Sequence, residues 1–345
     1  MKAMLLAAGA GTRLRPLTYQ IPKPLIPVAN RPVIHYVLDN LSRHGIKEIM
    51  INLSAHADQI RSYCGNGSQW GLRLHYSHET TLLGTAGGVK NVEAFFKGEP
   101  FLVMSGDGLS DIDLSDLIAF HKKKRALGTI AVKSIDSRFE YGVTLSDKSG
   151  RIKKFIEKPS WGDVFSSTVN TGIYLFEPEA LRYIPKGQIY DFGHQLWPKL
   201  LKLKKPIYAY PLKSYWTDVG NLSEYRKSQI DCLDGKVDIA LPGRQVSKGI
   251  WVEEPASVSP EAVLKAPCLI GKNVQISAYA EIGPYSVIGS NSKICSRAVL
   301  KNCMLFDNVV VEKEAHLSNC ILGPNSVVKE SINAYEAAVL NMPQQ

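Results

Sequence analysis

The sequence predicts an α/β fold followed by a parallel β-helix. Residues 1–235 alternate short apolar runs with amphipathic helical patterns, and the last third repeats a large apolar residue every six positions. The alternation is typical of a Rossmann-like, mostly parallel sheet with helices on both faces. A period of six fits neither a helix nor an ordinary strand. It predicts the flat walls of a parallel β-helix built from hexapeptide repeats.

The first part of the chain provides its elements in order. Residues 3–8 are apolar and predict a buried first strand. Apolar residues between Val33 and Leu41 recur on one face of a helix, and Gly45 is placed to end it. The same patterns predict strands at 49–53, 72–76, 101–105 and 152–156, and helices at 60–64, 87–96, 114–121 and 222–233.

The repeat of the last third runs through ten consecutive hexads. Each hexad opens with a large residue, which we expect to point into the core. The residue four positions later is small in most of the hexads. The phase slips after the tenth hexad and resumes at Leu322 and Val328. The large positions are Val252, Val258, Leu264, Ile270, Ile276, Ile282, Ile288, Ile294, Leu300 and Phe306.

Chain length and turn-forming residues predict two domains. At roughly 100–200 residues per domain, 345 residues suggest two. Turn signals at Asp234-Gly235 and Pro242-Gly243 place the boundary between the two patterns. We expect a first domain over 1–235, a linker over 236–250 and a β-helix domain over 251–345.

Composition excludes several classes of protein. A hydrophobic content of 45% with 21% charged residues rules out a largely disordered chain, and no apolar run approaches the ~20 residues of a membrane helix. The formal charge of +9 favours anionic partners. The basic runs at 121–125 and 199–205 lack interleaved aromatics, so nucleic acid is not expected as a partner. Six cysteines without a C-x-x-C pair predict reduced thiols and a cytoplasmic location.

A glycine-rich loop follows the first predicted strand. Gly9 and Gly11 allow backbone N–H groups to approach an anion, while Thr12 adds a hydroxyl and Arg13 a planar charged fork. Lys23 stands between two prolines, which stiffen the loop. A dinucleotide fingerprint requires glycine where the chain has leucine, and the Gly-Lys-Ser/Thr of a P-loop is missing. The loop therefore predicts a phosphate site of another kind.

Two aspartates stand where they could hold a divalent cation. Asp107 follows the strand 101–105 and a glycine, and Asp218 lies in the segment Trp216-Thr217-Asp218-Val219-Gly220. Mg²⁺ typically takes one or two carboxylates together with phosphate oxygens and waters. Turn or helix-capping roles are the alternative for either residue. Asp111 and Asp113 are assigned to turn and capping roles before the helix at 114–121.

The motif block resembles the sugar-1-phosphate nucleotidyltransferases, also called nucleotide-sugar pyrophosphorylases. It reads Gly-x-Gly-Thr-Arg-Leu-x-Pro-Leu-Thr from Gly9 and continues with Pro-Lys-Pro-Leu from Pro22. Within that family the chain is most similar to mannose-1-phosphate guanylyltransferases, through motifs at 30–32, 83–87, 141–143 and 218–220. The resemblance covers almost the whole chain and implies that the β-helix is left-handed. Two positions depart from common family residues, Arg31 and Gly88.

The resemblance implies a reaction and a set of site residues. A nucleoside triphosphate and a sugar-1-phosphate would give a nucleotide sugar and pyrophosphate, with GTP, mannose-1-phosphate and GDP-mannose as the expected compounds. The catalytic residues implied are Arg13, Lys23, Asp107, Lys158 and Asp218, the last with Asp107 on Mg²⁺. The nucleotide-binding residues implied are Leu6, Ala8, Gly9, Gly11, Thr12, Arg13, Gly84, Thr85, Gly106 and Asp107. The sugar-phosphate residues implied are Gly142, Glu157, Lys158, Asn170 and Thr171.

Other functions remain open at this stage. Thymidylyl or uridylyl transfer to glucose-1-phosphate uses the same scaffold. A non-catalytic subunit that senses nucleotide sugars is a third possibility, although the phosphate-loop cations and the metal acids are all present. Acyl transfer by the β-helix is not expected, because His316 is the only histidine after residue 250. We expect the β-helix to serve assembly or regulation, in a homo-oligomer without membrane partners.

Overall fold

The computed structural model describes residues 1–135, 141–160 and 166–341. Its contacts form two compact units. The first, here the sheet unit, comprises Met1–Ala10, Pro22–Pro24 and Ile34–Asp218. The second, here the β-helix unit, comprises Gly11–Ile21, Leu25–Val33 and Val219–Gln345. The phosphate loop is thus shared between the two units, and the linker at 236–250 stays a prediction.

Within the described residues of the sheet unit, nine strands form one sheet. Their order is β10-β9-β11-β6-β1-β4-β5, with β8 also beside β11 and β12 beside β8. All but β10 and β11 run in the same direction, which confirms the Rossmann-like, mostly parallel sheet. The bounds are β1 Lys2–Leu6, β4 Glu48–Leu53, β5 Arg73–His78, β6 Phe101–Ser105, β8 Gly128–Ser134, β9 Val143–Ser146, β10 Ile152–Ile156, β11 Thr168–Phe176 and β12 Ile207–Pro211.

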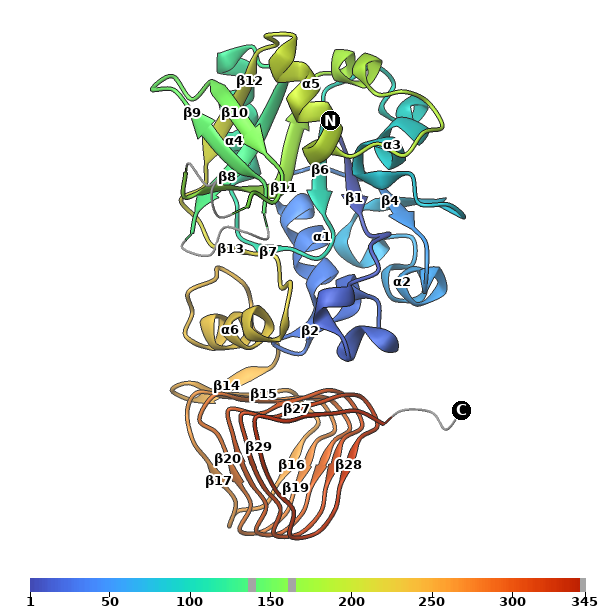
Figure 1. The fold of residues 1–345 in the computed structure, drawn as a ribbon. Helices are drawn as coiled ribbons and strands as arrows, with labels where there is room; N and C mark the ends of the chain where they lie inside the picture. Colours follow the sequence, from blue (N-terminus) through green and yellow to red (C-terminus); the bar gives the residue numbers. More distant parts are fainter. Residues whose placement is uncertain (136–140, 161–165, 342–345) are drawn as a thin grey trace. The chain divides into compact units, whose positions relative to one another are not determined.

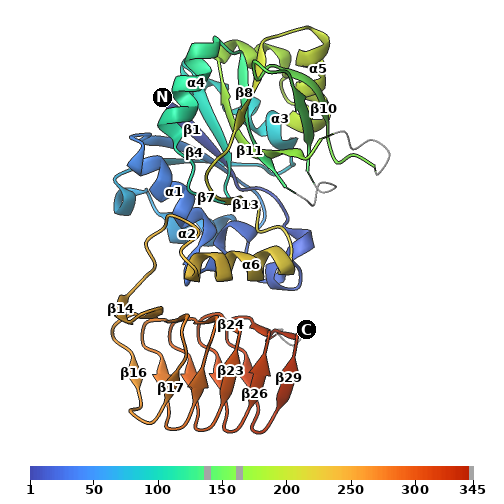
Figure 2. The same ribbon diagram turned by 90° about the vertical axis from the view of Figure 1, so that its left-hand side faces the viewer.

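Helices lie against both faces of this sheet (Figures 1 and 2). Their apolar sides meet a core in which aromatic rings stack, such as Phe176 on Trp197 with ring centroids 5.0 Å apart. No helix among the described residues is both long and apolar enough to cross a membrane. The bounds are α1 Val33–Arg43, α2 Ala57–Cys64, α3 Gly84–Asn91, α4 Leu114–Lys124 and α5 Trp197–Lys202.

Helix α3 starts three residues before the predicted position and ends earlier, with a 3-10 turn at Glu93–Phe96. The reason is tertiary. The N–H groups of Ala86 and Gly87 donate to the carbonyl of Tyr190 at 2.9 and 2.8 Å, so a segment about one hundred residues away fixes the first turn. Glycine at 84 and 87 gave no helical signal in the sequence.

The β-helix unit contains three sheets of short parallel strands stacked coil on coil (Figures 1 and 2). One holds β15 Ile250–Val252, β18 Cys268–Ile270, β21 Ser286–Ile288, β24 Met304–Leu305, β27 Ile321–Leu322 and β30 Ala338–Val339, after the antiparallel β14 Arg244–Ser247. The second holds β16 Ser257–Val258, β19 Gln275–Ile276, β22 Lys293–Ile294, β25 Val310–Val311 and β28 Val327–Val328. The third holds β17 Val263–Leu264, β20 Glu281–Ile282, β23 Val299–Lys301, β26 His316–Ser318 and β29 Asn333–Tyr335.

The core of the β-helix confirms nine of the ten predicted inward positions and corrects the tenth. Leu305, not Phe306, joins the row of inward side chains. The coil shortens there by one residue, since Cys268 pairs with Ser286 but Val287 pairs with Met304. The hydrophobic wall stays aligned because the ladder, not the residue count, sets the register.

The Phe306 ring instead contacts helix α6, which spans Leu222–Leu233. The Tyr225 and Phe306 rings lie 6.2 Å apart. The same helix holds a small hairpin, β2 Pro27–Val28 with β3 Arg31–Pro32, because Gln229 accepts the Ala29 N–H at 2.7 Å and donates to the Pro27 carbonyl at 2.9 Å. The bounds predicted for this helix are confirmed.

Candidate active site

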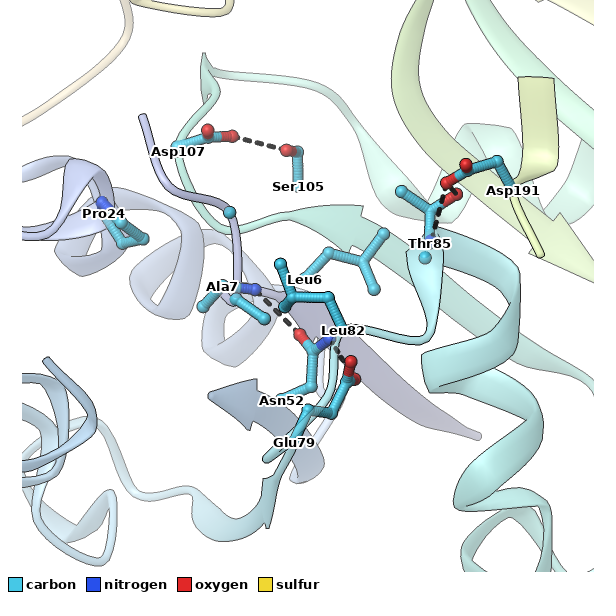
Figure 3. Close-up of a pocket in the computed structure, with 13 residues that line it drawn as sticks. Leu6, Ala7, Pro24, Asn52, Glu79, Leu82, Thr85, Ser105, Asp107 and Asp191 are labelled. Carbon is cyan, nitrogen blue, oxygen red and sulfur yellow. Dashed lines mark hydrogen bonds between the residues drawn. The ribbon is translucent and has the colours of Figure 1, made fainter. Parts of the chain in front are cut away.

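A cavity of about 240 Å³ opens at the carboxyl ends of the parallel strands. Register explains its position. Leu6 pairs with Asn52 on one side and with Ser105 on the other, so the ends of β1, β4 and β6 lie side by side. Figure 3 shows the residues around it. The lining residues are Leu6, Ala7, Ala8, Gly9, Pro24, Asn52, Glu79, Leu82, Gly84, Thr85, Ser105, Asp107 and Asp191.

One end of the cavity holds a buried polar network. The Asn52 amide accepts the Ala7 N–H at 2.9 Å and donates to Glu79 Oε1 at 2.8 Å (Figure 3). Glu79 Oε2 accepts the Leu83 N–H at 3.0 Å. Both oxygens of Glu79 therefore accept N–H donors, although the residue is only 4% exposed. Because every N–H here has an acceptor, the network fixes the Glu79 carboxylate beside the cavity.

The position of Glu79 in this network explains why residue 88 is a glycine. A Cβ at this position would lie 2.5 Å from Glu79 Oε1 and 3.1 Å from Asn52 Nδ2. A bulkier residue would therefore displace the carboxylate. The departure from the common family residue at 88 goes together with the placement of Glu79.

The other end of the cavity holds an ion pair. Lys23 Nζ lies 2.8 Å from Asp107 Oδ2, and the Ser105 hydroxyl donates to Asp107 Oδ1. Burial raises the pKa of Asp107, but the Lys23 ammonium and the hydrogen bonds from Lys23 and Ser105 outweigh it and hold the pKa below its ordinary value. Gly106, between strand and aspartate, donates its N–H to the Leu6 carbonyl at 2.9 Å. The carboxylate is thus charged, and it is held by Lys23 from a 3-10 turn and by Ser105 at the end of β6.

Asp218 reaches the same region through a two-stranded ladder. Strand β13, Trp216–Thr217, runs antiparallel to β7, Leu109–Ser110, with Thr217 opposite Leu109. Because the two strands are antiparallel, Asp218 leaves the ladder at the same end at which Gly108, the neighbour of Asp107, enters it. Two aspartates that are 111 positions apart in the sequence thus flank the same end of this ladder.

Tyr141 links Asp218 to the Glu-Lys-Pro motif. Its hydroxyl donates to Asp218 Oδ1 at 2.9 Å, and its carbonyl accepts the Lys158 N–H at 3.3 Å. Lys158 follows β10 and its side chain is exposed. Lys23, Lys158 and Asp218 are not among the residues that line the cavity.

Glu157 is half-buried, and its carboxylate makes no hydrogen bond or ion pair with the part of the chain that the structure describes. Burial raises the pKa of this carboxyl, while the nearby charges of His194 and Lys158 oppose the shift. A Cβ at Gly142 would lie 2.7 Å from Glu157 Oε2. The absence of a side chain at 142 leaves the space that this carboxylate fills.

Asn170 and Thr171 use their polar groups within the protein. The Asn170 amide donates to the Tyr174 hydroxyl at 2.8 Å and accepts the Gly172 N–H at 2.9 Å. The Thr171 hydroxyl donates to the Ala131 carbonyl at 2.7 Å, and the residue is 4% exposed. These bonds shape strand β11, and contact of either residue with the sugar phosphate stays a prediction.

The phosphate loop divides at Gly11. Leu6, Ala8 and Gly9 line the cavity, whereas Gly11, Thr12 and Arg13 belong to the β-helix unit. There Gly11 has a φ of 61°, which glycine adopts without strain, and a 3-10 turn follows at Thr12–Leu14. The Thr18 hydroxyl donates to the Gly11 carbonyl at 2.8 Å.

Sequence reasoning missed several residues of the cavity. Asn52 lies at the end of β4 and Glu79 directly after β5, so a search for polar residues at the end of every parallel strand would have found both. Asp191 gave no such signal, because its place depends on the packing of a distant segment against α3. Thr85 lines the cavity as predicted, but its N–H and its hydroxyl both bond Asp191 Oδ1, at 2.9 and 3.0 Å (Figure 3).

The carboxylates suit a magnesium ion held mainly by substrate. Among the described residues, no three His, Cys, Asp or Glu side chains form a closed metal site. Asp107 and Asp218, brought together by β7 and β13, match the one or two carboxylates that Mg²⁺ takes beside phosphate oxygens. Carboxylate oxygens are donors that Mg²⁺ accepts, and the magnesium assignment itself stays a prediction.

Comparisons with known proteins agree with this geometry. Residues 2–235 match the family model described as nucleotidyl transferase, and residues 264–342 match the one described as GMPPB C-terminal domain. A UTP–glucose-1-phosphate uridylyltransferase from Synechocystis is 37% identical over 89% of this chain and 83% of its own length. A mannose-1-phosphate guanylyltransferase from Mycobacterium tuberculosis is 32% identical over 90% of this chain and 81% of its own.

A solved structure shows the same fold in its catalytic part. It is a protein from Bacillus anthracis assigned as a glucose-1-phosphate thymidylyltransferase, with a TM-score of 0.63 and 25% identity over 70% of this chain and 96% of that one. Phosphate-loop glycines, a strand-end aspartate and a Glu-Lys-Pro motif thus occur together with a family match over most of the chain. The chain belongs to the sugar-1-phosphate nucleotidyltransferase family.

Proposed function

We propose that this chain transfers the guanylyl group of GTP to mannose-1-phosphate and releases pyrophosphate, which gives GDP-mannose. The observation that carries the choice of base is the buried Glu79 carboxylate at one end of the cavity. The match of residues 264–342 to the GMPPB C-terminal domain and the Mycobacterium tuberculosis relative support the choice of sugar.

The chemistry of Glu79 favours guanine. A carboxylate only accepts hydrogen bonds, and each of its oxygens has a lone pair left after the bonds from Asn52 and Leu83. Guanine offers two adjacent donors, N1–H and the N2 amino group. Uracil and thymine offer one donor flanked by two acceptors, so a carboxylate would face at least one repulsive oxygen.

Glu79→Gln is expected to lower kcat/KM for GTP about 10- to 100-fold and to improve UTP relative to GTP, because an amide can donate to a pyrimidine carbonyl. Steady-state pyrophosphate release with both nucleotides measures this. Glu157→Gln is the matched control and should leave the GTP-to-UTP ratio unchanged. An unchanged ratio in the Glu79 variant would reject Glu79 as the residue that reads the base.

A second candidate is uridylyl transfer to glucose-1-phosphate, favoured by the 37% identity to the Synechocystis enzyme. The two candidates separate in one assay. Pyrophosphate release is measured with four nucleoside triphosphates against mannose-, glucose- and galactose-1-phosphate. We expect the highest kcat/KM for GTP with mannose-1-phosphate. A tenfold preference for UTP with glucose-1-phosphate would establish the alternative instead.

The reaction needs charge compensation more than a protein nucleophile. The phosphate oxygen of the sugar phosphate is already ionised, so it attacks the α-phosphorus directly while the bond to the leaving pyrophosphate breaks. In the proposal Lys23 offsets negative charge on the triphosphate, and Lys158 offsets that on the sugar phosphate. Fixed charges aimed at a transferring phosphoryl group act without reorganisation during the reaction.

Asp107 and Asp218 would hold Mg²⁺ together with phosphate oxygens of the nucleotide. When bound, the ion neutralises charge on the phosphates and aligns the α-phosphorus with the attacking oxygen. Lys23 pairs with Asp107 at 2.8 Å, so its ammonium is already positioned where the phosphates would arrive.

Glu157 is the proposed acceptor for sugar hydroxyls, and its raised pKa gives a pH test. The charged form accepts hydroxyl donors best, so binding should weaken as pH falls through a value above the ordinary pKa of glutamate. We expect the ratio of KM for sugar-1-phosphate in Glu157→Gln to that in the wild type to shrink toward one at low pH. Taking this ratio cancels the titration of the sugar phosphate itself. A ratio independent of pH would contradict the role.

The proposal also covers catalysis against sensing, the cellular location and the oligomeric state. Catalysis rather than sensing is supported by the Lys23–Asp107 ion pair and the adjacent Asp218. We also propose that the chain works in the cytoplasm, where its six free cysteines would stay reduced, and that it forms homo-oligomers in which the β-helix takes part.

A further inference from the structure

One segment, residues 188–193, contacts both ends of the proposed site, and we call it the strap. Its hydrogen bonds to the start of α3 are numerous. The Tyr190 carbonyl accepts the N–H groups of Ala86 and Gly87, and the Tyr190 N–H donates to the Leu83 carbonyl at 2.8 Å. Asp191 Oδ1 accepts the N–H and the hydroxyl of Thr85. The strap therefore holds the turn that borders the base end of the cavity.

These bonds use the backbone N–H groups of the Gly-Thr-Ala-Gly motif within the protein. A helix N-terminus normally offers free N–H groups to an anion. In α3 the strap accepts the N–H groups of Thr85, Ala86 and Gly87 instead. A Cβ at Gly84 would lie 2.8 Å from the Tyr190 carbonyl oxygen, and one at Gly87 would lie 2.7 Å from that of Gln188. Both glycines thus allow the strap to approach.

The other end of the strap backs the sugar side. A Cβ at Gly193 would collide with the Glu157 carboxylate, so the bare backbone of Gly193 forms the wall against which Glu157 rests. Asp191 connects the two ends. Its carbonyl accepts the Gln195 and Leu196 N–H groups at 3.2 and 3.0 Å, which opens a π-helical turn, and its N–H donates to Gln195 Oε1 at 2.7 Å. Single π-helical turns are rare and are frequently found at functional sites.

We propose that Asp191 is a positioning residue that sets the geometry of the nucleotide and sugar-phosphate subsites together, through the strap. The proposal rests on the proposed function in that Glu79 marks the nucleotide end and Glu157 the sugar end. Asp191 clamps Thr85 with two hydrogen bonds to a charged acceptor, and the turn that starts at Asp191 carries Gly193. Loss of the two hydrogen bonds to Thr85 would therefore loosen both ends.

The test is steady-state kinetics of Asp191→Ala with the nucleotide and sugar phosphate that the wild type uses best. Choosing the pair from the substrate matrix keeps this test independent of the base and sugar; a wild type inactive with every pair would refute the proposed function instead. We expect KM for both substrates to rise about tenfold, the range for loss of a charged hydrogen bond. Asp191→Asn keeps an acceptor oxygen for Thr85 and should stay within about threefold of the wild type.

Asp113→Ala is the matched control. Asp113 caps α4 by accepting the Asp116 N–H at 3.0 Å, so its loss removes a comparable helix cap away from the cavity. Both alanine variants should lower Tm, but only Asp191→Ala should raise the two KM values. A rise in only one KM, no rise, or an equal rise in Asp113→Ala would overturn the proposal.

Thr85→Val gives a second route if Asp191→Ala does not fold. Valine removes the hydroxyl that donates to Asp191 and accepts the Phe192 N–H at 2.9 Å. A direct nucleotide contact of Thr85 would change KM for the nucleotide alone. The strap predicts that KM for the sugar phosphate rises as well, and an unchanged sugar-phosphate KM would overturn the proposal.

Discussion

Asp107→Asn is expected to lower kcat/KM at least about a thousandfold, because the substitution removes a charge from the centre of the proposed site. In the structure this carboxylate accepts from Lys23 and Ser105 and stands next to the end of the ladder that carries Asp218. Asparagine keeps the size and one acceptor oxygen. The fold should therefore survive while the negative charge needed to hold Mg²⁺ is lost.

The measurement combines pyrophosphate release over a Mg²⁺ titration with circular dichroism and direct Mn²⁺ binding in the presence of nucleotide. Asp111→Asn, directly after β7, is the control, since Asp111 accepts the Tyr215 N–H at 2.7 Å and an asparagine oxygen can do the same. The control should retain most activity. Wild-type turnover in Asp107→Asn at any Mg²⁺ concentration would reject the metal assignment.

Lys23→Met is expected to lower kcat/KM about 100- to 1000-fold, mainly through KM for the nucleotide, because the ammonium faces the place proposed for the triphosphate. Lys23 is 9% exposed and its charge is directed to Asp107 at 2.8 Å. Methionine keeps the length and the apolar stem but not the charge. Lys158→Met, on the exposed motif after β10, should instead raise KM for the sugar phosphate.

The same substitution at Lys23 has a consequence for stability that depends on pH. Without Lys23 the pKa of Asp107 should rise, because burial would no longer be opposed by the ammonium. A depressed pKa in the folded state contributes stability above the unfolded value, near about 3.9 for aspartate, and the contribution disappears as pH falls through the folded pKa. The stability difference between wild type and variant should thus be largest near neutral pH and vanish in acid. A difference that grows in acid would contradict the pairing.

Most of the fold could be predicted from the sequence because its patterns are local. Apolar runs with turn residues between them located five of the nine strands that the described part of the sheet contains, but not β8, β9, β11 and β12, and helix α6 has the predicted bounds. The hexad repeat predicted the β-helix core until Phe306, where a coil one residue shorter moved the inward position to Leu305. That change is invisible locally, because only the ladder against the neighbouring coil shows which residue faces the core.

The residues of the candidate site likewise fall into those that the sequence indicates and those that only the fold brings to the site. Lys23, Asp107 and Lys158 each stand in a motif that is recognisable from the sequence alone. Asn52 and Glu79 have no motif, and only their positions at the ends of two parallel strands could have indicated them. Asp191 has neither a motif nor a strand end, since its role exists only where the strap meets α3.

The order of elements, the repeat and the phosphate-binding motifs were thus determined by the sequence itself, since each depends on neighbours a few positions apart. The tertiary structure alone decided that Asp218 and Asp107 flank the same end of one ladder, that Glu79 is fixed beside the cavity and that the glycines of α3 allow the strap to approach. Each of these depends on which segments, far apart in the sequence, pair or pack with each other, and local patterns in the sequence do not show this.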